Sequence, residues 1–124
     1  MFDVLIVEDE PDLRALIVVV LGLRGFTVRD APHGAAALEL LAAEGLPHVI
    51  VTDRMMPVMG GEELIARLRA DPTTSAIPIL MLSANPPDEP GVPVIRKPFG
   101  LDDLCNVVDR LAGDATTNAE NARV

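Results

Sequence analysis

Five short apolar runs recur along the chain, and each is followed by a segment with a different pattern. The runs cover residues 2–7, 26–30, 48–53, 77–83 and 92–96. Most of them are continuously apolar rather than alternating, which is typical of parallel strands that are buried on both faces. The pattern therefore predicts five strands of one parallel sheet.

Four segments between and after these runs carry apolar residues at helical spacing: residues 11–23, 33–45, 61–70 and 101–113. In the first, Asp9 is a candidate N-cap, Pro11 suits the first turn and Gly25 can end the helix. Its β-branched residues make a strand the alternative, but its length and flanking residues favour a helix. This helix is apolar in nearly every direction, so it is either well buried or partly a docking or dimer surface.

Strands that alternate with helices predict an α/β fold with a doubly wound parallel sheet. We expect one domain over residues 1–112, followed by a disordered C-terminal tail over residues 113–124, which has almost no apolar content. The connection over residues 84–91 is shorter than an ordinary parallel crossover and contains Pro86, Pro87 and Pro90. The sequence therefore predicts an extended, proline-stiffened loop there in place of a helix.

The composition of the chain limits which cellular environment and which kinds of partner are expected. The formal net charge of −9 argues against nucleic acid or an anionic membrane as the main partner. Cys105 is the only cysteine, so no internal disulfide can form, and a cytoplasmic location is expected. The longest apolar run, residues 15–23, is shorter than a membrane span.

Chemically active side chains stand at the ends of four predicted strands: Glu8 and Asp9, then Asp53, Ser83 and Lys97. Taken singly, each has an ordinary structural interpretation as a cap, a solvated acid, a turn residue or a surface charge. Because the carboxyl ends of parallel strands share one edge, all five are expected to converge there. Clustered carboxylates without His or Cys favour Mg2+ or Mn2+ over Zn2+. A carboxylate beside such a metal can act as a nucleophile toward phosphorus.

Four motifs carry a resemblance to a known family: "VEDEP" (7–11), "DRMMPVMGG" (53–61), "LSA" (82–84) and "KPF" (97–99). With these motifs in this order, the chain resembles a response-regulator receiver domain of two-component signalling. The resemblance covers roughly residues 3–112 and implies an atypical single-domain member. The resemblance implies a flavodoxin-like five-stranded sheet of order 2-1-3-4-5. The short proline-rich connection means that the family's fourth crossover helix is absent or reduced to a loop.

The resemblance also implies roles for individual residues. Asp53 matches the phosphoacceptor, Ser83 the switch hydroxyl, and Lys97 the amine that contacts phosphoryl oxygens. The implied Mg2+ ligands are Glu8 (through water), Asp9, Asp53 and the backbone carbonyl of Met55. The Lys97–Pro98 peptide bond is expected to be cis.

The chain departs from the family pattern at two further positions. Val94 stands where an aromatic switch residue is common, and Gly60 where an acid is frequent. The expected function is acceptance of a phosphoryl group from a histidine kinase or phosphotransfer protein, with output through contacts to a downstream protein. A homodimer is one form that output could take, and the protein is not expected to be an enzyme.

Two alternatives stay open at this point. One is a degenerate receiver that acts as an interaction module without phosphorylation, which the missing helix and Val94 favour. The other is an aspartyl-phosphate phosphohydrolase. It is disfavoured because such enzymes need a second acid where Met55 stands.

Overall fold

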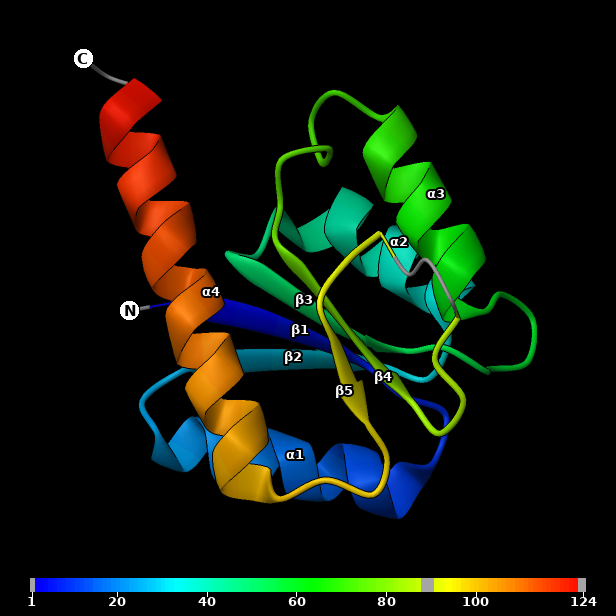
Figure 1. Ribbon diagram of the computed structural model, residues 1–124. Coiled ribbons are helices and arrows are strands. Elements are labelled where there is room, and N and C mark those ends of the chain that lie inside the picture. Colours follow the sequence, from blue (N-terminus) through cyan, green and yellow to red (C-terminus); the bar gives the residue numbers. More distant parts are fainter. Residues whose placement is uncertain (1, 88–90, 123–124) are drawn as a thin grey trace.

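The computed structural model describes residues 2–87 and 91–122, with side chains described as far as residue 113. Five strands and four helices alternate along the chain until β4, which β5 follows without an intervening helix in the described residues (Figure 1). The elements are β1 (Asp3–Val7), α1 (Pro11–Leu23), β2 (Thr27–Ala31), α2 (Gly34–Glu44), β3 (Val49–Asp53), α3 (Gly61–Ala70), β4 (Ile79–Ser83), β5 (Val94–Arg96) and α4 (Leu101–Ala122).

All strand pairs are parallel, as the apolar runs predicted, and the sheet order is β2-β1-β3-β4-β5, as the resemblance implied. The register places Val7 beside Thr52, and Asp53 beside Leu82. The carboxyl ends of β1, β3 and β4 therefore lie side by side, which is the arrangement that brings residues following these strands together.

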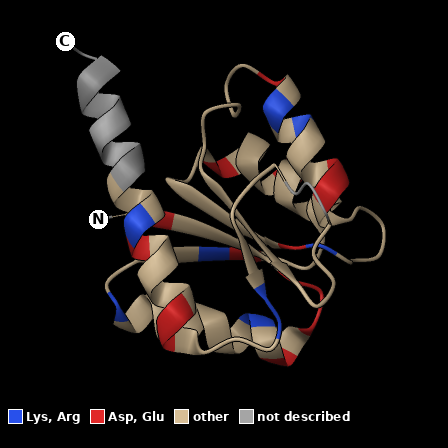
Figure 2. Ribbon diagram, viewed as in Figure 1, with Lys and Arg blue, Asp and Glu red and all other residues tan. Residues whose placement is uncertain are grey.

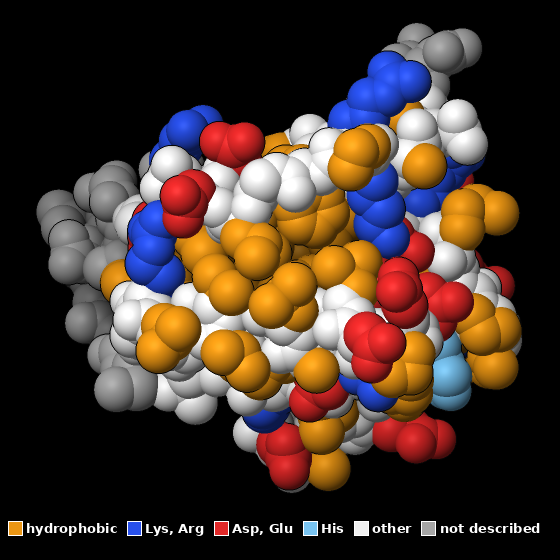
Figure 3. All heavy atoms as spheres, turned by 90° about the horizontal axis from the view of Figure 1, so that it is seen from below, with side chains coloured by type: hydrophobic (Ala, Val, Ile, Leu, Met, Phe, Trp, Pro, Cys, Tyr) orange, Lys and Arg blue, Asp and Glu red, His pale blue; other side chains and the backbone are white. Residues whose placement is uncertain are grey.

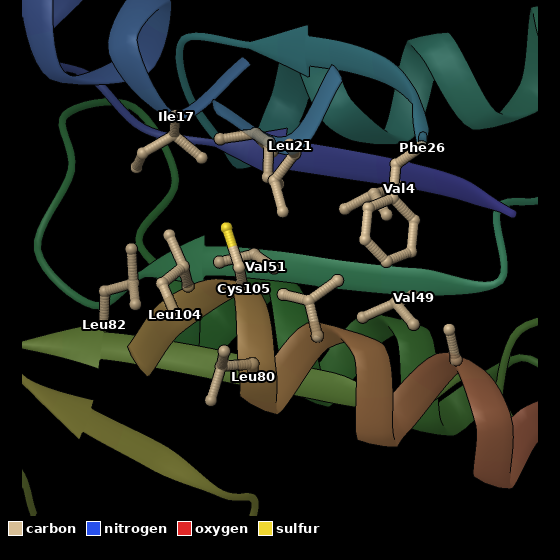
Figure 4. Close-up of a cluster of buried hydrophobic side chains, with 13 residues drawn as sticks. Val4, Ile17, Leu21, Phe26, Val49, Val51, Leu80, Leu82, Leu104 and Cys105 are labelled. Carbon is tan, nitrogen blue, oxygen red and sulfur yellow. The ribbon is translucent and has the colours of Figure 1, made fainter. Parts of the chain in front are cut away.

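The sheet is covered on both faces, because most side chains of its central strands are apolar and point to both sides. Val4 and Ile6 face α1 and α4, while Leu5 and Val7 face α2 and α3. Figure 4 shows the first of these clusters, where Leu104 and Cys105 of α4 pack toward Ile17 and Leu21 of α1 and toward strand residues. Cys105 is thus a small, fully buried core residue.

The connection from β4 to β5 contains no helix in its described parts, residues 84–87 and 91–93. This matches the prediction for the proline-rich segment, although Pro90 lies outside the described residues. The fifth strand begins at Val94, later than residue 92, where the sequence pattern placed it. Pro93 has no N–H for the ladder, but its carbonyl still accepts a hydrogen bond from the Met81 N–H at 2.9 Å.

The start of α1 differs from its predicted form. Glu10, not Asp9, occupies the N-cap position, and its side chain makes no cap hydrogen bond. Asp9 stands one residue too early to cap the helix, because Pro11 takes its first position. Asp9 is thereby left exposed next to the end of β1.

The apolar helix α1 is only partly buried, and its role as a docking or dimer surface remains a prediction. Ile17 and Leu21 are buried in the core, whereas Leu16, Val19 and Leu23 are large apolar side chains exposed to solvent. The face of the molecule seen in Figure 3 carries a broad group of apolar side chains bordered by charged ones. The helix therefore serves the core on one side and leaves an apolar stripe on the other.

The last helix, α4, extends through Ala122, so the predicted helix end at Gly113 is wrong. The residues after Gly113 contain no proline, and a glycine in an exposed helix weakens it by only about 1 kcal/mol. The division into a domain over residues 1–112 and a tail remains a prediction. No helix among the described residues is both long and apolar enough to span a membrane.

Candidate functional site

One edge of the sheet gathers the side chains that follow its strands. Glu8 and Asp9 follow β1, Asp53 ends β3, Ser83 ends β4, and Lys97 follows β5. Figure 2 shows the acidic turn after β1 close to the basic end of β5. The five residues that the sequence predicted to converge do lie at this edge.

Lys97 joins two of the acids directly. Its Nζ lies 2.8 Å from Oδ1 of Asp53 and 3.0 Å from Oε1 of Glu8. Its backbone N–H donates to the carbonyl oxygen of Ser83 at 2.9 Å, which fixes the start of the loop after β5 beside β4. The Lys97–Pro98 peptide bond is cis, as the resemblance implied.

Burial affects the pKa values of three side chains in this cluster. Burial raises the pKa of the Asp53 carboxyl above its usual range, and the hydrogen bond from Lys97 offsets this only in part. Burial likewise raises the pKa of Glu8, whose side chain is 1% exposed. Burial disfavours the Lys97 ammonium, but its hydrogen bonds to Asp53 and Glu8 outweigh this and raise the pKa of Lys97. The half-buried Lys97 ammonium thus faces two acids, Glu8 and Asp53.

The acids form a set that fits a hard cation. One carboxylate oxygen from each of Glu8, Asp9 and Asp53 can be chosen so that all three lie within 4.8 Å of one another. Three carboxylates against the single Lys97 ammonium leave an excess of negative charge, which a divalent ion would neutralise. Oxygen ligands of this kind suit Mg2+, so the residues present fit the metal that the resemblance implies.

A cavity of about 460 Å³ opens at the phosphoacceptor candidate. It is lined by Asp53, Arg54, Met55, Ser83, Ala84, Asn85 and Lys97. Ser83 is 2% exposed, and its Oγ accepts a hydrogen bond from the Asn85 N–H at 3.1 Å. The hydroxyl proton of Ser83 is therefore not used in this contact. Met55 is at the cavity, while the role of its carbonyl as a ligand remains a prediction.

Two residues of this cavity were not singled out from the sequence. Arg54 directly follows Asp53, and Asn85 stands two residues after Ser83. The Arg54 guanidinium donates to the carbonyl oxygen of Asn85, and its Nε lies 2.5 Å from Oε1 of Glu62. The only signal in the sequence was their position next to residues already marked as functional, because nothing in the spacing pairs Arg54 with Glu62 or Asn85.

A third basic residue, Arg14, supports the acidic turn after β1 from outside. Nη1 of Arg14 donates to the backbone carbonyl of Glu8 at 2.8 Å, and its Nε contacts Asp30 at 2.9 Å. The Glu8 N–H donates to the Ala31 carbonyl at 3.1 Å. The turn that carries the acids is thus tied to both α1 and β2.

A doubly wound sheet of order 2-1-3-4-5, with acids, a hydroxyl and an amine at one edge, places the protein in the flavodoxin-like receiver class. The family model described as "Response regulator receiver domain" matches residues 4–109. The chain belongs to this family, whose members are domains of two-component signal transduction.

Curated relatives of the chain differ greatly in length. It is 38% identical over 125 residues to the sensor histidine kinase TmoS of Ectopseudomonas mendocina, covering 90% of this chain but 13% of that protein. It is 39% identical over 109 residues to an uncharacterized 14.6 kDa protein of Leptolyngbya boryana, covering 88% of this chain and 82% of that protein. The chain thus spans a small part of some relatives and most of others.

Solved structures agree with this family. The receiver domain of a signal transduction histidine kinase from Syntrophus aciditrophicus matches with a TM-score of 0.86 and 27% identity, covering 92% of each chain. The chemotaxis protein CheY4 of Vibrio cholerae matches with a TM-score of 0.79 and 29% identity, covering 90% of this chain and 98% of that one.

Proposed function

We propose that this protein is a Mg2+-dependent phosphoacceptor that receives a phosphoryl group on Asp53 from a histidine kinase or a histidine phosphotransfer protein. The observation that carries the proposal is the contact of Lys97 with both Asp53 and Glu8 at an edge where Asp9 completes a carboxylate set. The phosphorylated protein then signals through contacts with a downstream protein.

The chemistry of the step follows from the residues at this edge. A carboxylate oxygen of Asp53 attacks phosphorus and forms an O–P bond. The N–P bond of the phosphohistidine donor breaks, and its electron pair stays on the imidazole nitrogen, which takes up a proton. Mg2+, held by Glu8, Asp9 and Asp53, would supply positive charge to the phosphoryl oxygens. Lys97 and the Ser83 hydroxyl donate to the same oxygens as negative charge develops on them.

The family relationship supports the choice of donor. TmoS is named a sensor histidine kinase, and other relatives include hybrid signal transduction histidine kinase D of Dictyostelium discoideum. Receivers of this family act together with such kinases. The proposal extends that relation to this chain without assigning a particular kinase.

A phosphodonor assay tests the proposal. Wild-type protein incubated with acetyl phosphate and Mg2+ should gain one phosphoryl group by intact-mass measurement, and hydroxylamine should remove it, as expected for an acyl phosphate. Asp53→Asn should gain none. Asp12→Asn is the matched control, because Asp12 is an exposed acid in the first turn of α1 and should label like wild type.

The same assay separates the alternatives. Label that persists in Asp53→Asn would refute the assignment of the acceptor. Failure of wild type to take up label, together with no Mg2+-induced rise in its melting temperature, would favour a degenerate receiver that acts without phosphorylation. Multiple turnover of phosphate esters would favour a phosphohydrolase, the function that Met55 disfavours.

A further inference from the structure

Arg54 connects three segments that meet at the phosphoacceptor cavity. Its backbone N–H donates to the Leu82 carbonyl at 2.9 Å, and its own carbonyl accepts from the Gly61 N–H at 2.8 Å. Its side chain contacts Glu62 in the first turn of α3 and donates to the carbonyl oxygen of Asn85 after β4. This one residue therefore ties the end of β3 to both the start of α3 and the connection that leaves β4.

The Asn85 carbonyl lies in a segment with few backbone donors. Asn85 is followed by Pro86 and Pro87, neither of which has an N–H. In a helical crossover, a carbonyl at this position would accept from an N–H four residues further along. No helix follows in the described residues of this connection. The Arg54 guanidinium supplies a hydrogen bond that a helix would otherwise have provided.

The Asn85 position is coupled to the hydroxyl at the active edge. The Asn85 N–H donates to Oγ of Ser83, which forms a local side-chain turn. The peptide group before the Asn85 Cα is thus held by Ser83, and the peptide group after it is held by Arg54. A residue that holds the Asn85 carbonyl in place therefore also keeps the Asn85 N–H in position. The hydrogen bond from this N–H to Oγ orients the Ser83 hydroxyl.

Arg54 is suited to this task by its shape and by its partner. Its side chain is 24% exposed, and the fork of donors lets it contact a carboxylate and a carbonyl at once, which a lysine does less well. The Glu62 side chain is 57% exposed, so an ion pair with it adds little stability by itself. The main effect of this ion pair is that it fixes the direction of the Arg54 guanidinium toward Asn85.

We propose that Arg54 is a positioning residue for phosphoryl transfer: oriented by Glu62, it holds Asn85 and thereby aims the Ser83 hydroxyl at the phosphoryl group on Asp53. In this way it takes over a role of the crossover helix that is absent from the described residues of this connection. The proposal rests on the function proposed above for Asp53.

The first test needs no phosphorylation. Amide exchange of Asn85, measured by NMR on the metal-free protein, should accelerate roughly tenfold in Arg54→Met, since one hydrogen bond is lost and the turn loosens. Glu62→Gln and Arg54→Lys should give smaller increases. Arg67→Met is the matched control, because Arg67 pairs with Glu63 on the exposed side of α3 at 3.4 Å and should leave Asn85 unchanged. Melting curves establish that each variant is folded.

The second test is a double-mutant cycle on the rate of labelling by acetyl phosphate. Arg54→Met and Ser83→Ala should each slow labelling roughly tenfold, as loss of one donor to the phosphoryl group would. The double variant should be no slower than Ser83→Ala, because Arg54 acts through Ser83. Additive losses, or unchanged Asn85 exchange in Arg54→Met, would overturn the proposal.

The two tests keep this proposal distinct from the proposed function. If wild type takes up no label, the phosphoacceptor function fails, and with it the role of Arg54 in transfer. The exchange measurement would still decide whether Arg54 positions the Ser83 turn. If wild type is labelled and the cycle is additive, the phosphoacceptor function stands and the role of Arg54 is refuted.

Discussion

Val58, in the loop between β3 and α3, adopts a backbone conformation that β-branched residues rarely occupy. Its φ is 67°, in the left-handed region. Such a conformation costs an L-amino acid with a Cβ roughly 1–2 kcal/mol. The side chain is 79% exposed, so little packing offsets this cost. Val58 therefore stores strain within the loop that follows Asp53.

Val58→Asn should increase the free energy of unfolding by about 1 kcal/mol, because asparagine tolerates the left-handed region. Urea denaturation measures the change. Val19→Asn is the control, since Val19 is exposed on α1 in ordinary helical conformation and the two residues have similar helix propensities. Equal effects at both positions would show that strain at Val58 is not the cause.

The residues of the site were predictable to different degrees. Glu8, Asp9, Asp53, Ser83 and Lys97 each stand where an apolar strand ends, so topology alone was enough to bring them together. Arg54 carries no such signal. Its role depends on where α3 and the β4–β5 connection place Glu62 and Asn85, and neither spacing nor hydropathy encodes those contacts.

At the scale of elements, α3 begins against the backbone that carries Asp53. A Cβ added to Gly61 would overlap the Asp53 carbonyl oxygen and lie 3.1 Å from the Arg54 Cα. Both contacts are with backbone atoms, which cannot move aside as a flexible side chain can. The first turn of α3 therefore requires a residue without a side chain to hold its place beside β3.

Gly61→Ala should lower the free energy of unfolding by about 2 kcal/mol, because the added methyl forces α3 away from β3. Gly22→Ala offers a contrast of opposite sign. Gly22 lies in α1, and apart from its chain neighbours and the backbone of the helix itself, no heavy atom lies within 4 Å of the place that an added methyl group would take. Alanine there should therefore raise the free energy of unfolding by about 0.5–1 kcal/mol. A stabilising Gly61→Ala in the same chemical denaturation series would contradict the close approach.

Element type was read more reliably from the sequence than element ends. The five strands and four helices of the described residues follow from apolar runs and helical spacing. The absence of a helix in the described part of the β4–β5 connection follows from proline, which removes donors. The end of α4 and the cap of α1 were misplaced. Both depend on weak local preferences of about 1 kcal/mol, which a single glycine or acid does not decide.

At the scale of the whole molecule, α4 closes one face of the sheet with side chains that precede Gly113. Its buried residues are Leu104, Cys105, Val108 and Ala112. All four precede Gly113, the boundary that the sequence predicts for the domain. The described packing of α4 against α1 and the sheet therefore comes from residues before Gly113.

A chain ended after Gly113 should retain its free energy of unfolding to within about 0.5 kcal/mol, because no described core contact is removed. Thermal and urea unfolding of the two lengths provide the comparison. A chain ended after Asn106 should unfold or lose more than about 3 kcal/mol, since it lacks Val108 and Ala112. A large loss on removing residues 114–124 alone would show that the domain extends further than predicted.

The brevity of β5 has a consequence for how copies of this protein behave in a crowded solution. An outermost strand presents unpaired backbone groups that can recruit a strand from another molecule, which is a route to aggregation. Here that strand is only Val94–Arg96, with Pro93 directly before it and Pro98 shortly after. Neither proline can donate to an incoming chain, and the exposed Arg96 adds charge. Pro93 and Pro98 thus also help to protect this edge of the sheet from intermolecular growth.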